Sequence, residues 1–120
     1  MTVQPPRLIA PRIAKIWTDK PAALNYEIAQ EKASTLGRLG RALEAALAAL
    51  KEFDARAIEP TAEIRRERNA LVAEAGYALW LFVVQREALG LRDSRQVMRD
   101  YAVPPEVQGR MGMLPARKPR

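Results

Sequence analysis

The spacing of apolar residues in two long stretches constrains the fold of this 120-residue chain more than any other feature. In the first stretch apolar residues recur at gaps of three or four positions, the period of an α-helix or coiled coil and not of a β-strand. They are Leu36, Leu39, Leu43, Leu47, Leu50, Phe53 and Ala57. The second stretch has the stripe Ile64, Leu71, Ala75, Ala78, Phe82 and Leu89. The sequence therefore predicts an all-α fold.

Local signals indicate where these two helices begin and end. Pro21 suits the start of the first helix, because proline is tolerated at the first helical position. Pro60 ends it, since the residue before a proline is pushed out of the α region. Thr61 then caps a second helix, and Gly90 ends that helix in the left-handed conformation. The expected helices span residues 23–57 and 61–89. We expect them to form a long antiparallel hairpin; one continuous helix kinked at Pro60 is the alternative.

Two short helices are expected after Gly90. Asp93 and Gln96 are spaced as in a capping box, which favours a helix at 94–101. Pro105 favours a further helical turn at 105–109. The last residues contain two prolines and three basic side chains, which is typical of a disordered tail. The expected organisation is an N-terminal arm at 1–20, a helical domain at 21–112 and a disordered basic tail at 113–120.

The N-terminal arm combines prolines with apolar residues. Pro5, Pro6 and Pro11 argue against a long helix before residue 20. The arm is nevertheless too apolar for a solvated tail, because it carries Leu8, Ile9, Ile13, Ile16 and Trp17. We expect it to dock, either on its own body or on a partner subunit.

The second helix has apolar residues on its back face as well as on its main stripe. On a helical wheel Tyr77, Trp80 and Val84 lie opposite that stripe, and a helix that is apolar all round must be covered on more than one side. The first helix covers one side only. It also carries a strip of small residues, which would allow close approach of a neighbour: Ala42, Ala46 and Ala49.

These two strips are the candidate interface of a homodimer. The predicted dimer is a four-helix bundle of two hairpins, because one self-complementary surface serves both copies. The competing prediction is a monomer in which residues 8–17 fold back over the same apolar face. The C-terminal segment is a further candidate to cover part of it.

The residue types present exclude most common catalytic chemistry. The chain has no cysteine and no histidine, which removes thiolate chemistry, the commonest general base and the commonest metal ligand. Glu27 and Glu31 lie four residues apart, as do Glu63 and Glu67. Metal-binding helical bundles add histidine to such pairs, so solvated faces are the interpretation favoured here. We expect no catalytic residue, no cofactor and no metal site.

The net charge of +6 is located mainly at the two ends of the chain. Four arginines form a candidate anion or nucleic-acid contact, because the guanidinium matches phosphate oxygens: Arg92, Arg95, Arg99 and Arg110. The helical turn that follows Arg99 is short and begins with two prolines, which suits a DNA-recognition helix poorly. The pattern therefore does not favour nucleic acid as a partner.

Arg86 interrupts the main stripe of the second helix between Phe82 and Leu89. Two arrangements would accommodate its charge. Its guanidinium extends to the edge of the bundle, or it pairs with a carboxylate of a neighbouring helix.

The remaining features concern location and resemblance. The longest apolar run is too short to span a membrane, and no signal peptide is apparent, so a cytoplasmic protein is expected. The stretch from Tyr77 to Gly112, with its Gly-Leu-Arg-Asp-Ser-Arg and Tyr-Ala-Val-Pro-Pro runs, is similar to short bacterial all-helical proteins of unknown function. That resemblance implies the same fold class and no activity.

The sequence as a whole favours a non-enzymatic, self-associating helical interaction protein. The alternative is a nucleic-acid-associated or regulatory protein that uses the basic C-terminal segment.

Overall fold

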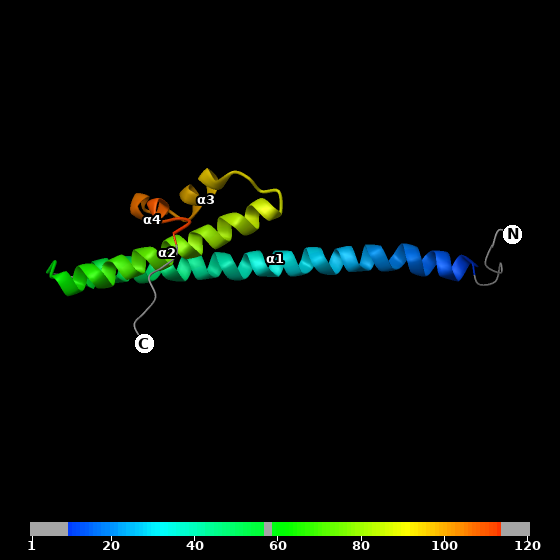
Figure 1. The fold of residues 1–120 in the computed structure, drawn as a ribbon, viewed down its shortest axis with the longest axis horizontal. Coiled ribbons are helices and arrows are strands. Elements are labelled where there is room, and N and C mark those ends of the chain that lie inside the picture. Colours follow the sequence, from blue (N-terminus) through cyan, green and yellow to red (C-terminus); the bar gives the residue numbers. More distant parts are fainter. Residues whose placement is uncertain (1–9, 57–58, 114–120) are drawn as a thin grey trace. The chain divides into compact units, whose positions relative to one another are not determined.

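The computed structural model describes the backbone of residues 10–56 and 59–113, with side chains from Ala22 onward. The regular structure within these ranges consists entirely of helices (Figure 1). They are α1 (Ala10–Arg56), α2 (Ala62–Ala88), α3 (Ser94–Asp100) and α4 (Pro105–Gly109). The predicted all-α class is confirmed. The chain divides into two parts, residues 1–34 and residues 35–120, and α1 contributes to both.

Helix α1 begins at Ala10, well before the start expected near residue 21. The expectation that prolines prevent a long helix before residue 20 was therefore wrong for residues 10–20. Pro11 occupies the second helical position, where its missing N–H would have no intrahelical partner. Pro21 lies in the helix interior, where the helix continues with one backbone hydrogen bond fewer. Residues 1–9 of the predicted arm lie outside the described residues.

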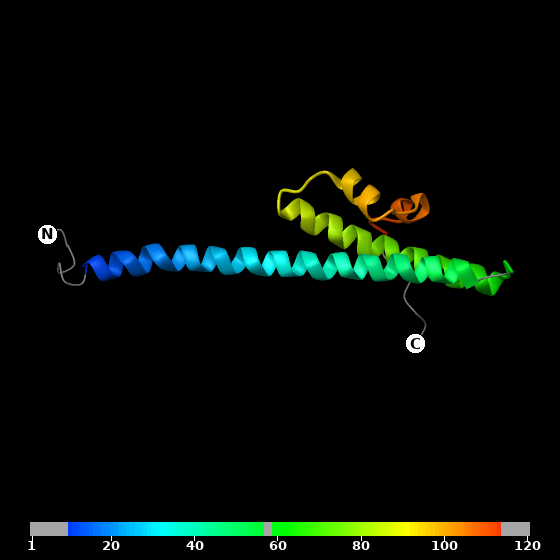
Figure 2. The ribbon, with the colours of Figure 1, turned by 180° about the vertical axis from the view of Figure 1, so that it is seen from behind.

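The second half of α1 and helix α2 form the predicted antiparallel hairpin. Asp54, near the end of α1, is bonded to Arg68, near the start of α2. Farther from the break at Pro60 on both helices, Gly40 of α1 lies against the ring of Phe82 of α2. Figures 1 and 2 show α2 beside this half of α1 in both views. The chain is not helical at residues 59–61, so the alternative of one helix kinked at Pro60 was wrong.

The hydrophobic core of the second part draws on all four helices. Leu43 of α1 and Leu79 of α2 are fully buried at its centre. Burying a side chain of this size stabilises the fold by about 1.5–3 kcal/mol relative to leaving it exposed. The buried residues that contact one another are Leu43, Leu50, Val72, Ala75, Leu79, Phe82, Val83, Val97, Val103 and Val107. The short C-terminal helices are therefore part of the core and not a surface addition.

Helix α2 is bounded as its sequence predicts. The Thr61 hydroxyl accepts a hydrogen bond of 3.1 Å from the backbone N–H of Ile64, which is the expected N-cap. Gly90 has φ +86°, and the N–H of Leu91 donates to the carbonyl of Arg86. This is a Schellman end, in which the left-handed residue is usually glycine because it has no Cβ. The expected helix end at Gly90 is confirmed.

Helix α3 ends with the same motif, but its left-handed residue is Ala102. The φ of Ala102 is +49°, and the N–H of Val103 donates to the carbonyl of Met98. A side chain in this conformation costs about 1–2 kcal/mol. At the other end of α3, Asp93 is the N-cap residue, but its side chain makes no capping hydrogen bond. The helix starts at Ser94 as expected, but without the Asp93 capping bond on which the prediction rested.

Helix α4 leads the chain directly onto the back of α2. A Cβ placed on Gly76 would lie 2.8 Å from the Cβ of Arg110 and 3.0 Å from its carbonyl carbon and oxygen. Real Cβ atoms do not approach other atoms this closely, so this contact requires glycine. Ala73 and Gly76 are both buried. The C-terminal segment thus covers this part of the back face, as one of the three sequence-based alternatives proposed. Residues 114–120 of the predicted tail lie outside the described residues.

Candidate functional site

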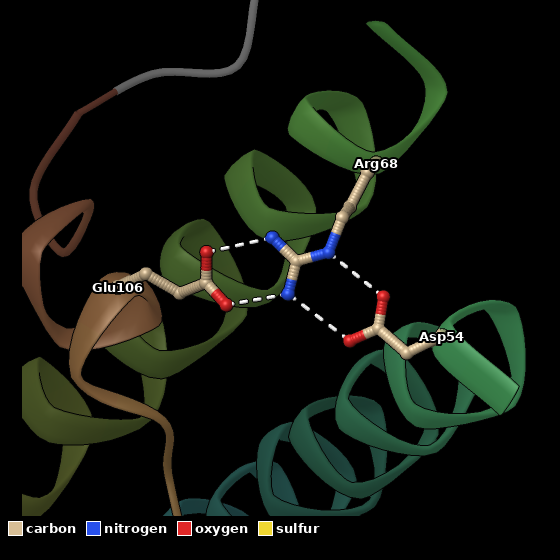
Figure 3. Close-up of polar contacts among 3 residues, drawn as sticks. All are labelled: Asp54, Arg68 and Glu106. Carbon is tan, nitrogen blue, oxygen red and sulfur yellow. Dashed lines mark hydrogen bonds and ion pairs between the residues drawn. The ribbon is translucent and has the colours of Figure 1, made fainter. Parts of the chain in front are cut away.

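The most prominent polar feature of the described residues is the Arg68 cluster, formed by Asp54, Arg68 and Glu106 (Figure 3). Each carboxylate belongs to a different helix and accepts two hydrogen bonds from the one guanidinium on α2. The Nε of Arg68 lies 2.7 Å from Oδ1 of Asp54 on α1, and its Nη2 lies 3.0 Å from Oδ2. Its Nη1 lies 2.7 Å from Oε2 of Glu106 on α4, while Nη2 also donates to Oε1. The cluster therefore ties α1, α2 and α4 together.

The charges of the cluster stabilise one another. Hydrogen bonds from Arg68 lower the pKa of Asp54 and the pKa of Glu106 below their ordinary values. The bonds from Glu106 and Asp54 in turn raise the pKa of Arg68. The side chains are between 32% and 45% exposed, so water screens the interaction and its net contribution is modest. The cluster remains fully charged at neutral pH.

A cavity of about 400 Å³ adjoins the Arg68 cluster between α1 and the turn that joins α3 to α4. Its apolar lining comes from Leu47 and Leu50 of α1 and from Tyr101 and Pro104 of the turn. Lys51 and the three residues of the cluster supply the charged part of the lining. Two cations thus face two anions, so the cavity carries no excess charge that would select a charged ligand.

The chemistry available at this site is limited. A general acid or base needs a pKa near the working pH, whereas the pKa values of both carboxylates are lowered away from neutrality. Each carboxylate already accepts two bonds from Arg68. In the part of the chain that the structure describes, no group of three or more acidic side chains could hold a metal ion. The geometry of the cluster suits a structural tie between helices.

The predicted interface residues of α2 form a partly exposed apolar strip, here called the α2 face (Tyr77, Trp80 and Val84). Trp80 is 37% exposed and Val84 is 44% exposed, while Tyr77 is half-buried. The Tyr77 and Trp80 rings contact each other, with centroids 6.2 Å apart. The expectation that this face is buried is therefore not met within the single chain at Trp80 and Val84. The C-terminal segment reaches this face, because a Cβ on Gly112 would lie 3.8 Å from Cδ1 of Trp80.

The small-residue strip predicted on α1 is only partly exposed to solvent. Ala42 and Ala49 are exposed, whereas Ala46 is half-buried and packs against the core. These alanines lie on α1 and the α2 face lies on the other helix of the hairpin, so the candidate interface comprises two strips on two helices.

The four candidate arginines do not form one equivalent set. Arg92, Arg95 and Arg99 are exposed, and none of them forms an ion pair with another residue of the described ranges. Arg110 is half-buried, and its Cβ and backbone pack against Gly76. The position of Arg110 is therefore explained by the contact of the C-terminal segment with α2.

Arg86 is half-buried, and its guanidinium lies beside an aromatic ring of its own helix. Its guanidinium carbon lies 5.9 Å from the centre of the Phe82 ring, which is within range of a cation–π interaction. Its Nε atom is buried and has no hydrogen-bond partner among the described residues. The predicted pairing with a carboxylate of a neighbouring helix is not observed there.

The Arg68 cluster was not predicted from the sequence, although part of the signal was present. Asp54 and Arg68 lie at similar distances along the chain from the break at Pro60, so an antiparallel hairpin places them opposite each other. Glu106 is 38 positions from Arg68 in sequence, and no local pattern connects the two.

Together these features define a class: a helical-hairpin protein whose two short C-terminal helices close its core. A model of a family of unknown function, DUF6665, matches residues 13–119, and the chain belongs to this family. The resemblance to uncharacterised helical proteins is thereby confirmed at the level of a family of unknown function. Searches of curated proteins and of solved structures gave no match. Among the described residues no helix has the length and apolar character needed to cross a membrane.

Proposed function

We propose that this protein is a non-enzymatic, self-associating helical interaction protein, and that two copies meet through the α2 face. The observation that carries the proposal is the exposure of Trp80 and Val84, two large apolar side chains on a helix that contributes much of the core. Exposed aromatic and aliphatic side chains next to a packed core are typical of contact surfaces, and tryptophan is among the residues most enriched at their centres.

A second copy of the chain is the occupant that we propose, and it meets no charge repulsion on this face. Residues 75–85 contain no charged side chain, so this stretch of α2 meets a copy of itself without bringing like charges together. A two-fold axis through the α2 face would place Trp80 and Val84 of one copy against those of the other. Met113, which follows Gly112 beside Trp80, is 55% exposed and would enlarge the apolar contact.

The proposed assembly is a four-helix arrangement of two hairpins. The exposed alanines of α1, Ala42 and Ala49, allow close approach of a neighbouring helix at the edge of the contact. Neither the cluster at Arg68 nor its adjoining cavity is required for this function, and no cofactor takes part in it. A cytoplasmic location is proposed with it.

The test is the effect of a charge placed on the α2 face. Val84→Glu introduces a carboxylate at a position that is 44% exposed, so the single chain tolerates it while a buried contact does not. Ala70→Glu is the matched control, because residue 70 is exposed on the more polar first half of the same helix. We expect Val84→Glu to lower the mass in solution, measured by light scattering, and Ala70→Glu to leave it unchanged. An equal mass for both variants and the unaltered protein would refute the α2 face as a contact.

A further inference from the structure

The cavity beside the Arg68 cluster has no part in the proposed self-association. Its lining includes neither the α2 face nor the exposed alanines of α1, Ala42 and Ala49. Its volume is about 400 Å³, although packed proteins contain few voids larger than a water molecule. This volume lies within the range of small-molecule sites, about 300–1,000 Å³. The cavity is therefore a candidate for a second function of the chain.

The two long walls of the cavity are apolar. Leu47 and Leu50 of α1 belong to one wall, and the rings of Tyr101 and Pro104 belong to the other. Leu50 is only 2% exposed, whereas Ala48, which also lines the cavity, is exposed. The cavity thus has a buried floor and an opening through which a molecule can enter from solvent.

Contacts within the protein hold the Tyr101 wall in place. The ring of Tyr101 meets the ring of Phe82 at a steep angle, with centroids 5.3 Å apart. Its hydroxyl lies against α1, because a Cβ on Gly40 would be only 3.0 Å from the hydroxyl oxygen. The adjacent Val103 is 6% exposed, and its carbonyl accepts a 3.0 Å hydrogen bond from the side chain of Gln108. Closure of the cavity would break these contacts, so it exists before any ligand arrives, as most small-molecule sites do.

The Arg68 cluster supplies polar groups at one end of the cavity. Its carboxylates belong to opposite walls, Asp54 to α1 and Glu106 to α4, and each accepts two hydrogen bonds from Arg68. An ionised carboxylate has about four acceptor positions, so both carboxylates retain acceptors for a ligand. Lys51 forms no ion pair with another residue of the described ranges, so its ammonium donors are available too.

The charges of this end select against a charged ligand. A carboxylate or phosphate would approach Lys51 but would also lie beside two carboxylates of the cluster. An amine would instead lie beside the cations of Lys51 and Arg68. An uncharged group that both donates and accepts hydrogen bonds meets neither repulsion. Along the apolar walls water finds few partners, so an apolar body that displaces this water gains affinity.

We propose that this cavity binds an uncharged small molecule that has a flat apolar ring system and one hydroxyl or amide group. The rings lie between the leucines of α1 and the rings of Tyr101 and Pro104, since aromatic side chains pack well against flat rings. The polar group bonds to Lys51 and to a carboxylate of the Arg68 cluster. A cavity of about 150 Å³ accommodates benzene, so this larger cavity has room for two fused rings.

The test compares three naphthalene derivatives that share one ring system and differ in charge: naphthol, naphthoate and naphthylmethylammonium. Isothermal titration of the full chain at neutral pH measures the affinity for each. We expect naphthol to bind severalfold more tightly than either ion, and to raise the thermal midpoint because it binds the folded chain. Absence of naphthol binding, or tighter binding of either ion, would overturn the proposal.

Two alanines of α1 locate the bound naphthol. Ala48→Phe places a ring at the opening of the cavity, and Ala48 is exposed, so the core is not altered. Ala45→Phe is the matched control, because Ala45 is exposed on the same helix and does not line the cavity. We expect Ala48→Phe to weaken naphthol binding severalfold and Ala45→Phe to leave it unchanged. Equal affinities of the two variants would overturn the cavity as the binding site.

Lys51→Met tests the charge argument without filling the cavity. It leaves the lining with one excess negative charge, and Lys51 is exposed, so the fold does not depend on it. We expect the variant to bind naphthylmethylammonium more tightly than the natural chain does, and naphthol more weakly. Unchanged affinities for both would overturn the proposed contact with Lys51.

The site at this cavity and the α2 face are tested separately. Val84→Glu should bind naphthol as tightly as the natural chain does, whatever its mass in solution, because Val84 does not line the cavity. A loss of naphthol binding in Val84→Glu together with full binding in Ala48→Phe would place the naphthol on the α2 face and overturn the cavity site.

Discussion

At the scale of single residues, the two left-handed helix ends offer a paired test. Gly90 and Ala102 occupy equivalent positions in two Schellman ends, but only Ala102 carries a Cβ at positive φ. Replacing Ala102 with Gly removes a strain of about 1–2 kcal/mol, partly offset by the greater freedom of glycine in the unfolded chain. We expect Ala102→Gly to stabilise the protein by about 0.5–1 kcal/mol, seen as a higher thermal midpoint.

The converse substitution, Gly90→Ala, should change the stability of the protein in the opposite direction. Nothing lies within 4 Å of a Cβ built there, so Gly90→Ala introduces backbone strain and no clash. We expect it to lower the stability by about 1 kcal/mol. Shifts of the same sign for Gly90→Ala and Ala102→Gly would show that φ does not control these positions.

Gly76 is the residue at which the fit between α2 and the C-terminal segment can be measured. A methyl group there would overlap the backbone of Arg110, which is the kind of overpacking that costs about 1–3 kcal/mol. Gly109→Ala is the matched control, because a Cβ at Gly109 meets nothing within 4 Å. We expect denaturant unfolding to show a clear loss of stability for Gly76→Ala and none for Gly109→Ala. Equal losses would argue against close contact at Gly76.

At the scale of elements, the Arg68 cluster should make the attachment of α4 sensitive to acid. Arg68 lowers the pKa of Asp54 and of Glu106 in the folded state, so both carboxylates bind protons less readily there than in the unfolded chain. Their contribution to stability is therefore complete above the ordinary values of 3.8 and 4.5 and is lost as the pH falls through the lower folded-state values.

The prediction from this linkage concerns the difference between the natural chain and Arg68→Gln. We expect the thermal midpoint of the natural chain to exceed that of Arg68→Gln at pH 7 and the two to converge as the pH approaches 3. Because the carboxylates are exposed, the difference should be modest and should shrink with added salt. A difference that is constant from pH 7 to pH 3 would mean that the ion pairs do not contribute.

The helices themselves were largely predictable, and the exceptions have physical causes. The end of α2 at Gly90, its N-cap at Thr61 and the break at Pro60 follow from local chemistry, and the structure has all three. The start of α1 was missed because prolines were weighed as helix breakers, although Pro11 falls in the first turn, where proline is tolerated. The contact of Arg110 with Gly76 depends on tertiary packing that no local pattern encodes.

The candidate site shows the same division between local and tertiary information. The sequence alone predicted that Tyr77, Trp80 and Val84 share one apolar face, because that placement depends only on the helical period. The extent to which the C-terminal segment covers that face was not, since it depends on where the turn after α4 places Gly112 beside Trp80. The ion pair between Glu106 and Arg68 was not predicted either, because it also depends on tertiary packing.

At the scale of the whole molecule, the nucleic-acid alternative makes a distinct prediction. Arg95 and Arg99 are exposed one helical turn apart on α3, which is suitable for phosphate contacts. Asp93 and Asp100 lie on the same short segment and reduce its net charge. We expect fluorescence anisotropy to detect no duplex DNA complex that survives roughly 200 mM salt. A tight complex at that salt concentration, abolished by Arg95→Ala with Arg99→Ala, would favour the alternative function.

Self-association also predicts a dependence of stability on protein concentration. Anything that binds the folded chain and not the unfolded chain stabilises it by mass action, and a second copy is no exception. The thermal midpoint should therefore rise steadily as the concentration of the natural chain is raised over several tenfold steps.

Variants on the α2 face should reduce this dependence in proportion to the contact they remove. At low concentration, where chains separate, Val84→Glu should unfold near the temperature of the natural chain, because Val84 is already 44% exposed. At high concentration the thermal midpoint of Val84→Glu should be lower than that of the natural chain, whereas the midpoint of Ala70→Glu should equal it. Differential scanning calorimetry over the concentration series measures both effects. A natural chain whose midpoint stays constant over the series would contradict self-association, since the free energy of any contact between copies must appear in this slope.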